Sequence, residues 1–181
     1  MALMYKTRSW EHFDNPILGG CESVNVLDVG GVCYSSYNIN GTGSGVILAS
    51  YISGTPTRST AAITDTEHVA FIQRAMIQIH GDIAAEQFTG IYDRQCCEYD
   101  RYQVGAWADP LVGQQELYIP AYYQTEFKTI FIAEHTSYTH ARIFSALDSA
   151  VRATTQLLLD LGLVDKAEYI VEEWMGRWIK L

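Results

Sequence analysis

The chain has 181 residues, 48% hydrophobic and 18% charged, which is enough to bury the core of one globular domain. Its formal net charge of −9 should repel polyanions, so we exclude nucleic acid and acidic membrane surfaces as partners. No apolar run approaches the ~18 residues that span a bilayer, and the N-terminus lacks the apolar stretch of a signal peptide. We therefore expect a soluble, cytoplasmic protein.

The first half of the chain predicts strands at residues 2–5, 31–37 and 46–52. The glycine-rich segment 38–45 is interpreted as the connection of a hairpin, because no helix follows it to form a phosphate loop. Thr64-Asp-Thr-Glu67 is a capping box, and it predicts a helix over residues 66–80 that Gly81 ends.

The cysteines are Cys21, Cys33, Cys96 and Cys97. Their spacing matches neither a metal site nor a disulfide framework, so we expect neither. The adjacent pair is interpreted as packing residues.

The second half of the chain predicts a strand followed by two helices. Residues 127–133 form an apolar, β-branched run, and a helix over about 139–161 follows, stopped by Gly162. Its expected core face consists of Ile143, Leu147, Ala150, Leu157, Leu158 and Leu161. A further amphipathic helix begins near Asp165, and its Trp174 and Trp178 should cover the core or a subunit contact. The predicted fold is α/β or α+β, a mixed, largely antiparallel sheet covered by helices.

The junction between this strand and helix is a candidate ligand site. Loops between a strand's end and a helix N-terminus gather free backbone N–H groups, and this loop holds Glu134, His135, Tyr138 and His140. Each of these residues alone has an ordinary structural explanation; Glu134, for example, could cap the helix. The cluster favours a ligand-facing role.

The run Ile130-Phe-Ile-Ala-Glu134 and the helix after it resemble the last dinucleotide-contacting segment of the flavin-dependent amine oxidase and L-amino-acid oxidase family. The resemblance extends over essentially the whole chain, and its segments look like the substrate domain and C-terminal tail of microbial, especially fungal, amino-acid oxidases. These segments are Leu3-Met-Tyr-Lys-Thr-Arg-Ser-Trp10, Pro16-Ile-Leu-Gly-Gly20, Val46-Ile-Leu-Ala-Ser-Tyr51, Gly105-Ala-Trp107 and Gln114-Gln-Glu-Leu-Tyr118.

The resemblance implies a single domain, residues 1–181, with two origins. Residues 1 to about 120 resemble the substrate domain, and about 121–181 resemble the last strand and helices of the FAD domain. The Gly-x-Gly-x-x-Gly unit through which the family mainly binds FAD does not occur in the sequence. We therefore expect a truncated relative whose isolated chain binds no FAD; the alternative is FAD binding with Glu134 as its contact.

Three positions depart from the family pattern. Trp107 matches the first of two aromatic rings that flank the family's substrate, but the second ring falls on Arg142, a permanent cation. Ala133 stands where the family has Gly before its Glu. Ala106 matches the position of a cofactor-linking Cys in the monoamine oxidase branch, so no covalent flavin is expected.

These changes lie around the family's substrate cavity, which suggests a new use for it. In this interpretation His140 shuttles protons, Tyr138 or Glu134 is the partner acid or base, and Arg142 holds an anion or oxyanion. The substrate walls are Trp107, Tyr122, Tyr123 and His135.

Three functions follow as hypotheses. The first is a cofactor-independent isomerase or cyclase acting on an amino-acid-derived or alkaloid-like small molecule of secondary metabolism. The second is an FAD-dependent oxidase subunit completed by a separate N-terminal chain, and the third is a non-catalytic small-molecule binding module. We also expect a homo-oligomer, most simply a homodimer, that buries apolar surface formerly facing the FAD domain.

Overall fold

The computed structural model describes residues 1–103 and 105–175, and it divides the chain into two compact units, Met1–Tyr99 and Asp100–Leu181. Within each unit the residues contact mainly one another, and the boundary says nothing about the ancestry of the two parts. The predicted single domain with a change of ancestry near residue 120 therefore stays a prediction. No helix in the described part of the chain is long and apolar enough to cross a membrane.

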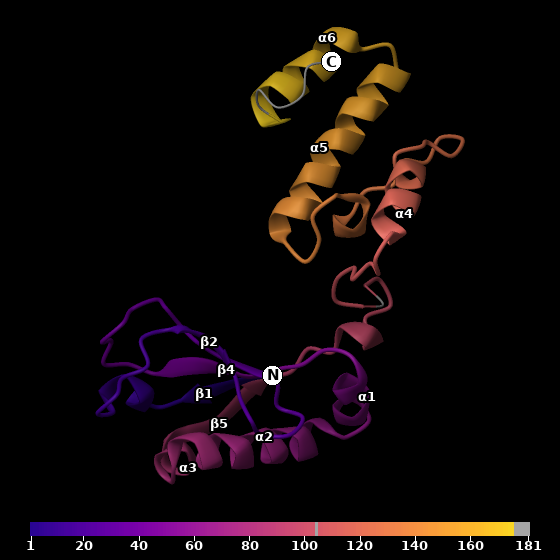
Figure 1. Ribbon diagram of the computed structural model, residues 1–181. Coiled ribbons are helices and arrows are strands. Elements are labelled where there is room, and N and C mark those ends of the chain that lie inside the picture. The colour runs from indigo at the N-terminus through magenta and orange to yellow at the C-terminus, as the bar shows by residue number, and fades with distance from the viewer. Residues whose placement is uncertain (104, 176–181) are drawn as a thin grey trace. The chain divides into compact units, whose positions relative to one another are not determined.

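The first unit is built on a five-stranded sheet in the order β2-β3-β4-β1-β5, in which every neighbouring pair is antiparallel (Figure 1). The strands are β1 (Ala2–Tyr5), β2 (Gly20–Ser23), β3 (Gly31–Tyr34), β4 (Gly45–Tyr51) and β5 (Phe88–Asp93). The predicted β1, β3 and β4 are confirmed, although β3 ends earlier than expected, and residues 38–45 do connect a β3–β4 hairpin. The sequence did not predict β2 and β5, whose residues are mostly exposed and lack apolar alternation.

Helix α2 (Asp65–His80) covers one face of this sheet (Figure 1). Its capping box is formed as predicted, with the Thr64 hydroxyl accepting from the Glu67 N–H, and Gly81 ends the helix with φ 78°. Ile72 and Met76 are fully buried in the core cluster that also contains strand residues such as Leu3 and Ile47. Shorter helices complete the unit: η1 (Ser9–His12), α1 (Thr55–Ala61), α3 (Ile83–Gln87) and η2 (Cys97–Tyr99).

A buried ion pair fixes the β3–β4 connection. The Arg8 guanidinium lies 2.6 Å from the Glu11 carboxylate and donates to the carbonyls of Ser35, Tyr37 and Asn38. Glu11 also accepts from the Asn40 N–H at 2.7 Å, and both charged residues are at most 5% exposed. The conformation of the β3–β4 connection therefore depends on one cation and one anion that are both buried away from water.

The expectation of no disulfide is wrong, because Cys21 and Cys33 are disulfide-bonded. They lie directly opposite each other on β2 and β3, and this register brings two side chains within bonding reach. The pairing was hidden because β2 itself was not predicted. Cys96 and Cys97 are free and half-buried.

His68 should make the stability of the first unit depend on pH. This residue of α2 is 6% exposed, and burial, followed by the charges of Arg94 and the N-terminus, lowers its pKa from 6.5 to about 4. The unfolded chain binds the proton more tightly, so the contribution of neutral His68 is present above pH 6.5 and is lost as the pH falls towards 4. The loss amounts to at most about 3 kcal/mol.

Urea unfolding of the wild type and His68→Gln at several pH values measures this effect. We expect the unfolding midpoint of the wild type to fall more steeply between pH 6.5 and pH 4.5 than that of His68→Gln. The matched control is His12→Gln, which changes an exposed histidine and should retain the wild-type slope. Equal slopes for all three proteins would contradict the assignment.

The second unit is helical in the part that the structure describes. It contains α4 (Gln114–Tyr122), η3 (Glu134–Thr136), α5 (Ile143–Asp160), α6 (Val164–Ile170) and the π-helical turn η4 (Val171–Met175). The predicted long helix is confirmed as α5, which starts later than expected, and Gly162 follows with φ 72°. The helix expected from Asp165 corresponds to α6 and η4. Its Trp174 is 69% exposed, and Trp178 lies outside the described residues.

The strand predicted at residues 127–133 is wrong. Glu126 and Thr129 form an isolated bridge, Phe127 is fully exposed with φ 57°, and 130–133 are irregular. A strand is stable only beside another strand, and all five strands that the structure describes lie in the first unit.

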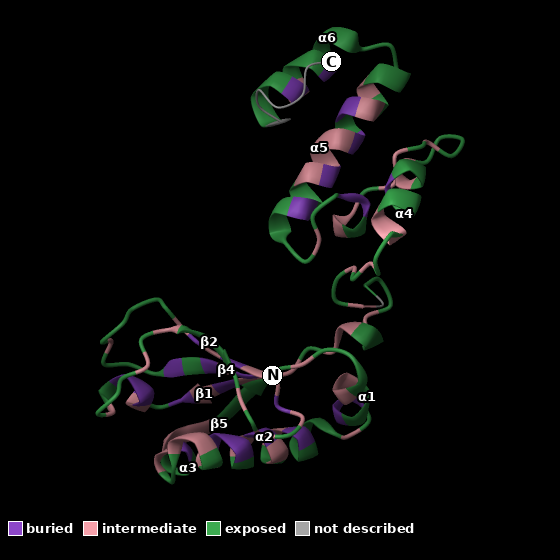
Figure 2. Ribbon diagram, in the orientation of Figure 1, coloured by how far each residue is buried: buried purple, intermediate pink, exposed green. Residues whose placement is uncertain are grey.

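The face of α5 expected to form core is largely exposed. Figure 2 shows buried, intermediate and exposed positions along this helix. Ile143, Leu147, Leu157 and Leu161 are between 47% and 84% exposed, and Ala150 and Leu158 are half-buried. The buried positions of the helix are instead small or polar: Ser145, Ser149, Ala153 and Thr155.

Candidate functional site

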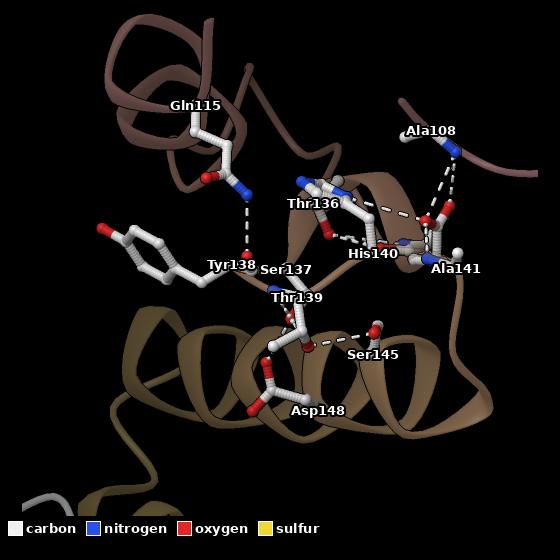
Figure 3. A network of polar contacts seen from close by, with 12 residues as sticks. Ala108, Gln115, Thr136, Ser137, Tyr138, Thr139, His140, Ala141, Ser145 and Asp148 are labelled. Atoms are coloured by element: carbon white, nitrogen blue, oxygen red, sulfur yellow. Dashed lines mark hydrogen bonds and ion pairs between the residues drawn. The ribbon is translucent and has the colours of Figure 1, made fainter. Parts of the chain in front are cut away.

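Three polar residues of α5, namely Ser145, Asp148 and Arg152, form a polar stripe along the helix. They bind the loop that carries the candidate site residues. The Ser137 hydroxyl donates to Asp148 at 2.9 Å, and the hydroxyls of Thr139 and Ser145 are 3.0 Å apart (Figure 3). Arg152, one turn beyond Asp148, donates to the Phe131 carbonyl. Positions 145, 148 and 152 share one side of a helix, which explains why polar residues face inwards here.

Glu134 joins this loop to the segment before α4. Its carboxylate accepts from the N–H of Ala141 at 2.7 Å and of Ala108 at 3.1 Å (Figure 3). It also lies 3.6 Å from Nδ1 of His140. Glu134 therefore does not cap α5 itself: Arg142 is the N-cap residue, and that position has no side-chain cap.

A cavity of about 210 Å³ lies beside this carboxylate, within the second unit. His135, His140 and Tyr122 line it together with polar residues that the sequence reasoning missed, namely Asp109, Gln114 and Gln115. The His140 side chain is 13% exposed, and neither of its ring nitrogens has a hydrogen-bond partner among the described residues. Both ring nitrogens are buried, and Nδ1 faces the Glu134 carboxylate, so the imidazole belongs to the cavity wall without a completed hydrogen bond.

Two of the predicted site residues, Tyr123 and Tyr138, pack with Arg152 instead. The Arg152 guanidinium lies 4.2 Å from the Tyr123 ring centroid, and the rings of Tyr123 and Tyr138 meet edge to face at 6.1 Å. Burial raises the pKa of Tyr123 and lowers that of Arg152. Neither tyrosine lines the cavity. The spacing of Asp148 and Arg152 along one helix side was the sequence signal that could have indicated this cluster.

The structure does not bring Trp107 or Arg142 to the cavity lining. Trp107 is 37% exposed. Arg142 is exposed at the start of α5, and its side chain makes no hydrogen bond or ion pair with any residue that the structure describes. The predicted anion clamp therefore has no geometric support in this arrangement.

The described residues around Glu134 offer few backbone donors to a dinucleotide. Both Glu134 oxygens already accept backbone N–H groups, and the start of α5 provides one helix N-terminus. The glycine-rich strand–helix unit that supplies most backbone donors to a pyrophosphate does not occur in the sequence. Nor do the described residues hold a group of three or more His, Cys, Asp or Glu side chains that could bind a metal ion.

Ala141 carries local backbone strain between Glu134 and α5. Its φ of 59° lies in the left-handed region, which is costly for a residue with a Cβ atom. We expect Ala141→Gly to stabilise the second unit against unfolding by about 1 kcal/mol. Thermal unfolding measures this, with Ala146→Gly, inside α5, as a matched control that should destabilise by about 1 kcal/mol. If both substitutions destabilised the protein, the assignment of backbone strain to Ala141 would be contradicted.

Comparison with known proteins shows the family of this chain. Residues 1–158 match the family described as flavin containing amine oxidoreductase, so the chain belongs to that family, as the sequence resemblance predicted. The fold is similar to that of a putrescine oxidase, a double mutant with redesigned cofactor binding, with a TM-score of 0.62. That match has 16% identity and covers 95% of this chain and 34% of the other.

Two relatives are L-amino-acid oxidases. The chain is 49% identical to the one from Neurospora crassa, over 99% of this chain and 26% of that protein. It is 31% identical to the one from Siganus canaliculatus, over 90% of this chain and 31% of that protein. The chain thus spans between a quarter and a third of the length of these relatives.

Proposed function

We propose that this chain supplies the substrate-domain part, and one cofactor-facing segment, of an FAD-dependent L-amino-acid oxidase. The observation that carries the proposal is the 49% identity to the Neurospora crassa enzyme over 99% of the chain. The cavity lined by His135, His140 and Tyr122 agrees with such a role, because it is a polar, aromatic hollow of about 210 Å³ beside Glu134. The remaining FAD-binding residues would come from outside these 181 residues.

A hybrid enzyme tests this proposal. In it, the segment of the Neurospora crassa L-amino-acid oxidase that aligns with this chain is replaced by the chain itself. We expect a yellow hybrid that contains FAD and releases hydrogen peroxide when given L-amino acids. A soluble hybrid that binds no flavin, or binds it and oxidises no substrate of the parent enzyme, would contradict the proposal.

The second candidate is the cofactor-independent isomerase or cyclase. It is supported by one observation: His140 and His135 line a cavity built wholly from residues of this chain. The isolated chain, without flavin, should then exchange the α-proton of an amino-acid substrate in heavy water, and His140→Ala should abolish the exchange. The oxidase proposal expects no exchange, and a non-catalytic binding module would show ligand protection without exchange.

Arg142 separates the two enzymatic candidates. Arg142 does not line the cavity of this chain, but the family resemblance places the second aromatic ring at this position, so in the hybrid a ring would replace a cation beside the substrate. We expect Arg142→Trp to raise the kcat/KM of the hybrid for L-amino acids by about tenfold or more, because the substrate is better oriented. Arg142→Gln is the control that removes the charge alone. If Arg142 were an anion clamp of an isomerase, both variants would instead lower proton exchange by the isolated chain.

A further inference from the structure

The Cys21–Cys33 disulfide lies on the side of the first unit's sheet that faces away from the core under α2. In β3, Val32 and Tyr34 are buried in the core cluster, whereas Cys33 between them is only half-buried. Successive side chains of a strand point to opposite faces, so Cys33 belongs to the outer face. Its partner Cys21 is exposed. A reagent in solution can therefore approach the bond from the Cys21 side.

Strand β2 depends on this bond more than the other strands of the sheet do. It lies at one end of the strand order, so β3 is its one strand neighbour. All four of its residues are exposed, which means that its side chains bury no apolar surface. Pairing of two strands without a buried face is marginal in water. Gly19 and Gly20, with φ of 98° and 90°, begin the strand without side chains that would restrict its movement.

The chain after β2 is anchored by contacts that do not involve the disulfide. Val29 is fully buried, and its carbonyl accepts from the Ser50 hydroxyl at 2.9 Å. The Val24 N–H donates to the Gly30 carbonyl at 3.1 Å. Because these contacts survive cleavage of the sulfur–sulfur bond, we expect cleavage to release β2 alone.

We propose that Cys21–Cys33 is a site of reversible thiol–disulfide exchange in the folded protein, and that its reduction frees β2 from β3. The proposal is independent of the proposed function. The thiolate of a small dithiol attacks Sγ of Cys21, forms a mixed disulfide and expels Cys33 as a thiolate, which takes up a proton. The second thiolate of the reagent then displaces the Cys21 sulfur, which is protonated in turn. The reagent leaves as its own disulfide, and the protein has gained an electron pair and two protons.

Hydrogen peroxide reverses the step. One cysteine thiolate attacks the peroxide, its sulfur becomes a sulfenic acid, and hydroxide leaves. The other thiol then condenses with the sulfenic acid, so the disulfide forms again and water is released. The edge position of β2 keeps both sulfur atoms within reach of each other once the strand pairs again in the register that sets Cys21 opposite Cys33.

Alkylation of the folded chain tests the exchange. The full chain is incubated with dithiothreitol and then with iodoacetamide, and the labelled cysteines are identified by peptide mass spectrometry. We expect Cys21 and Cys33 to be labelled at a rate that does not rise with urea kept below the unfolding transition, and peroxide to protect them again. A disulfide that is reduced only where urea unfolds the unit would overturn the proposal.

The matched control for this experiment is Cys96→Ser/Cys97→Ser, which removes the two free thiols that the structure describes. We expect this variant to be reduced at the wild-type rate, because the external dithiol attacks the bond directly. Loss of reduction in the variant would overturn the proposal, since the exchange would then run through those thiols.

Hydrogen exchange measures the release of β2. Reduction should raise the exchange rate of the amides in residues 20–24 by about tenfold or more and leave the amides of α2 unchanged. The variant Cys21→Ser/Cys33→Ser should reproduce this pattern without any reagent. Unchanged exchange in residues 20–24, or an equal increase in α2, would overturn the proposal, because the bond would then either not hold β2 or hold the whole unit.

Discussion

Replacing Glu11 with Gln should lower the free energy of unfolding of the first unit by about 3–5 kcal/mol. The change leaves the Arg8 guanidinium buried without its anion, 5% exposed and held only by carbonyl oxygens. A buried charge that loses its partner keeps the full cost of its removal from water. Urea unfolding followed by circular dichroism at neutral pH measures the loss.

The matched control for this variant is Asp65→Asn, which breaks the ion pair between Arg94 and Asp65. The Asp65 side chain is 61% exposed, so this pair is solvated and its loss should change the free energy of unfolding by less than about 1 kcal/mol. If Glu11→Gln were no more destabilising than Asp65→Asn, the buried pair would not hold the β3–β4 connection in the way described.

Replacing His140 with Ala should lower the turnover of the hybrid oxidase by ~10²–10⁴, as is typical when a group that transfers a proton is removed. The imidazole lines the cavity, lies 3.6 Å from the Glu134 carboxylate and has no hydrogen-bond partner among the described residues. A substrate that reaches this buried imidazole would meet nitrogens that lack a completed hydrogen bond. Steady-state peroxide release measures the effect, and the flavin content should stay unchanged.

Two controls accompany the His140 variant. His12→Ala changes an exposed histidine of the first unit and should retain full turnover. His140→Gln keeps a hydrogen-bonding side chain and should retain the fold, but it should remain slow if proton transfer rather than orientation is lost. Full activity of His140→Ala would place the chemistry elsewhere.

Features of the fold with a local cause could be predicted from the sequence. Strand β1 and helix α2 follow from apolar periodicity and from the Thr64 capping box, and both are confirmed. Strands β2 and β5 were missed because exposed strands have no apolar alternation to detect. The disulfide of Cys21 and Cys33 depends on the register of β2 against β3, so it could not be found without β2.

The second unit shows where periodicity misleads. The apolar residues of α5 were assigned to the core. In the structure, the side of α5 that faces inwards is instead the one that forms hydrogen bonds to the 131–139 loop, through Ser145, Asp148 and Arg152. The apolar run 127–133 was interpreted as a strand, yet pairing requires a neighbouring strand that sequence periodicity cannot supply.

The candidate site was predicted in part. The concentration of Glu134, His135 and His140 at one junction was visible in the sequence, and the structure brings these residues together around a cavity or beside it. The positions taken from the family resemblance, Trp107 and Arg142, do not line that cavity. A resemblance assigns positions relative to a whole enzyme, whereas the described contacts involve only the residues of this chain.

The central claim, that this chain is part of an L-amino-acid oxidase, is tested most directly by reduction of the hybrid's flavin without oxygen. An L-amino acid is mixed anaerobically with the hybrid, and the flavin absorbance is followed over time beside the unmodified Neurospora crassa enzyme. We predict that the flavin of the hybrid is bleached by L-amino acids and not by their D-isomers. A flavin-loaded hybrid that stays oxidised with every L-amino acid that reduces the parent enzyme would contradict the claim.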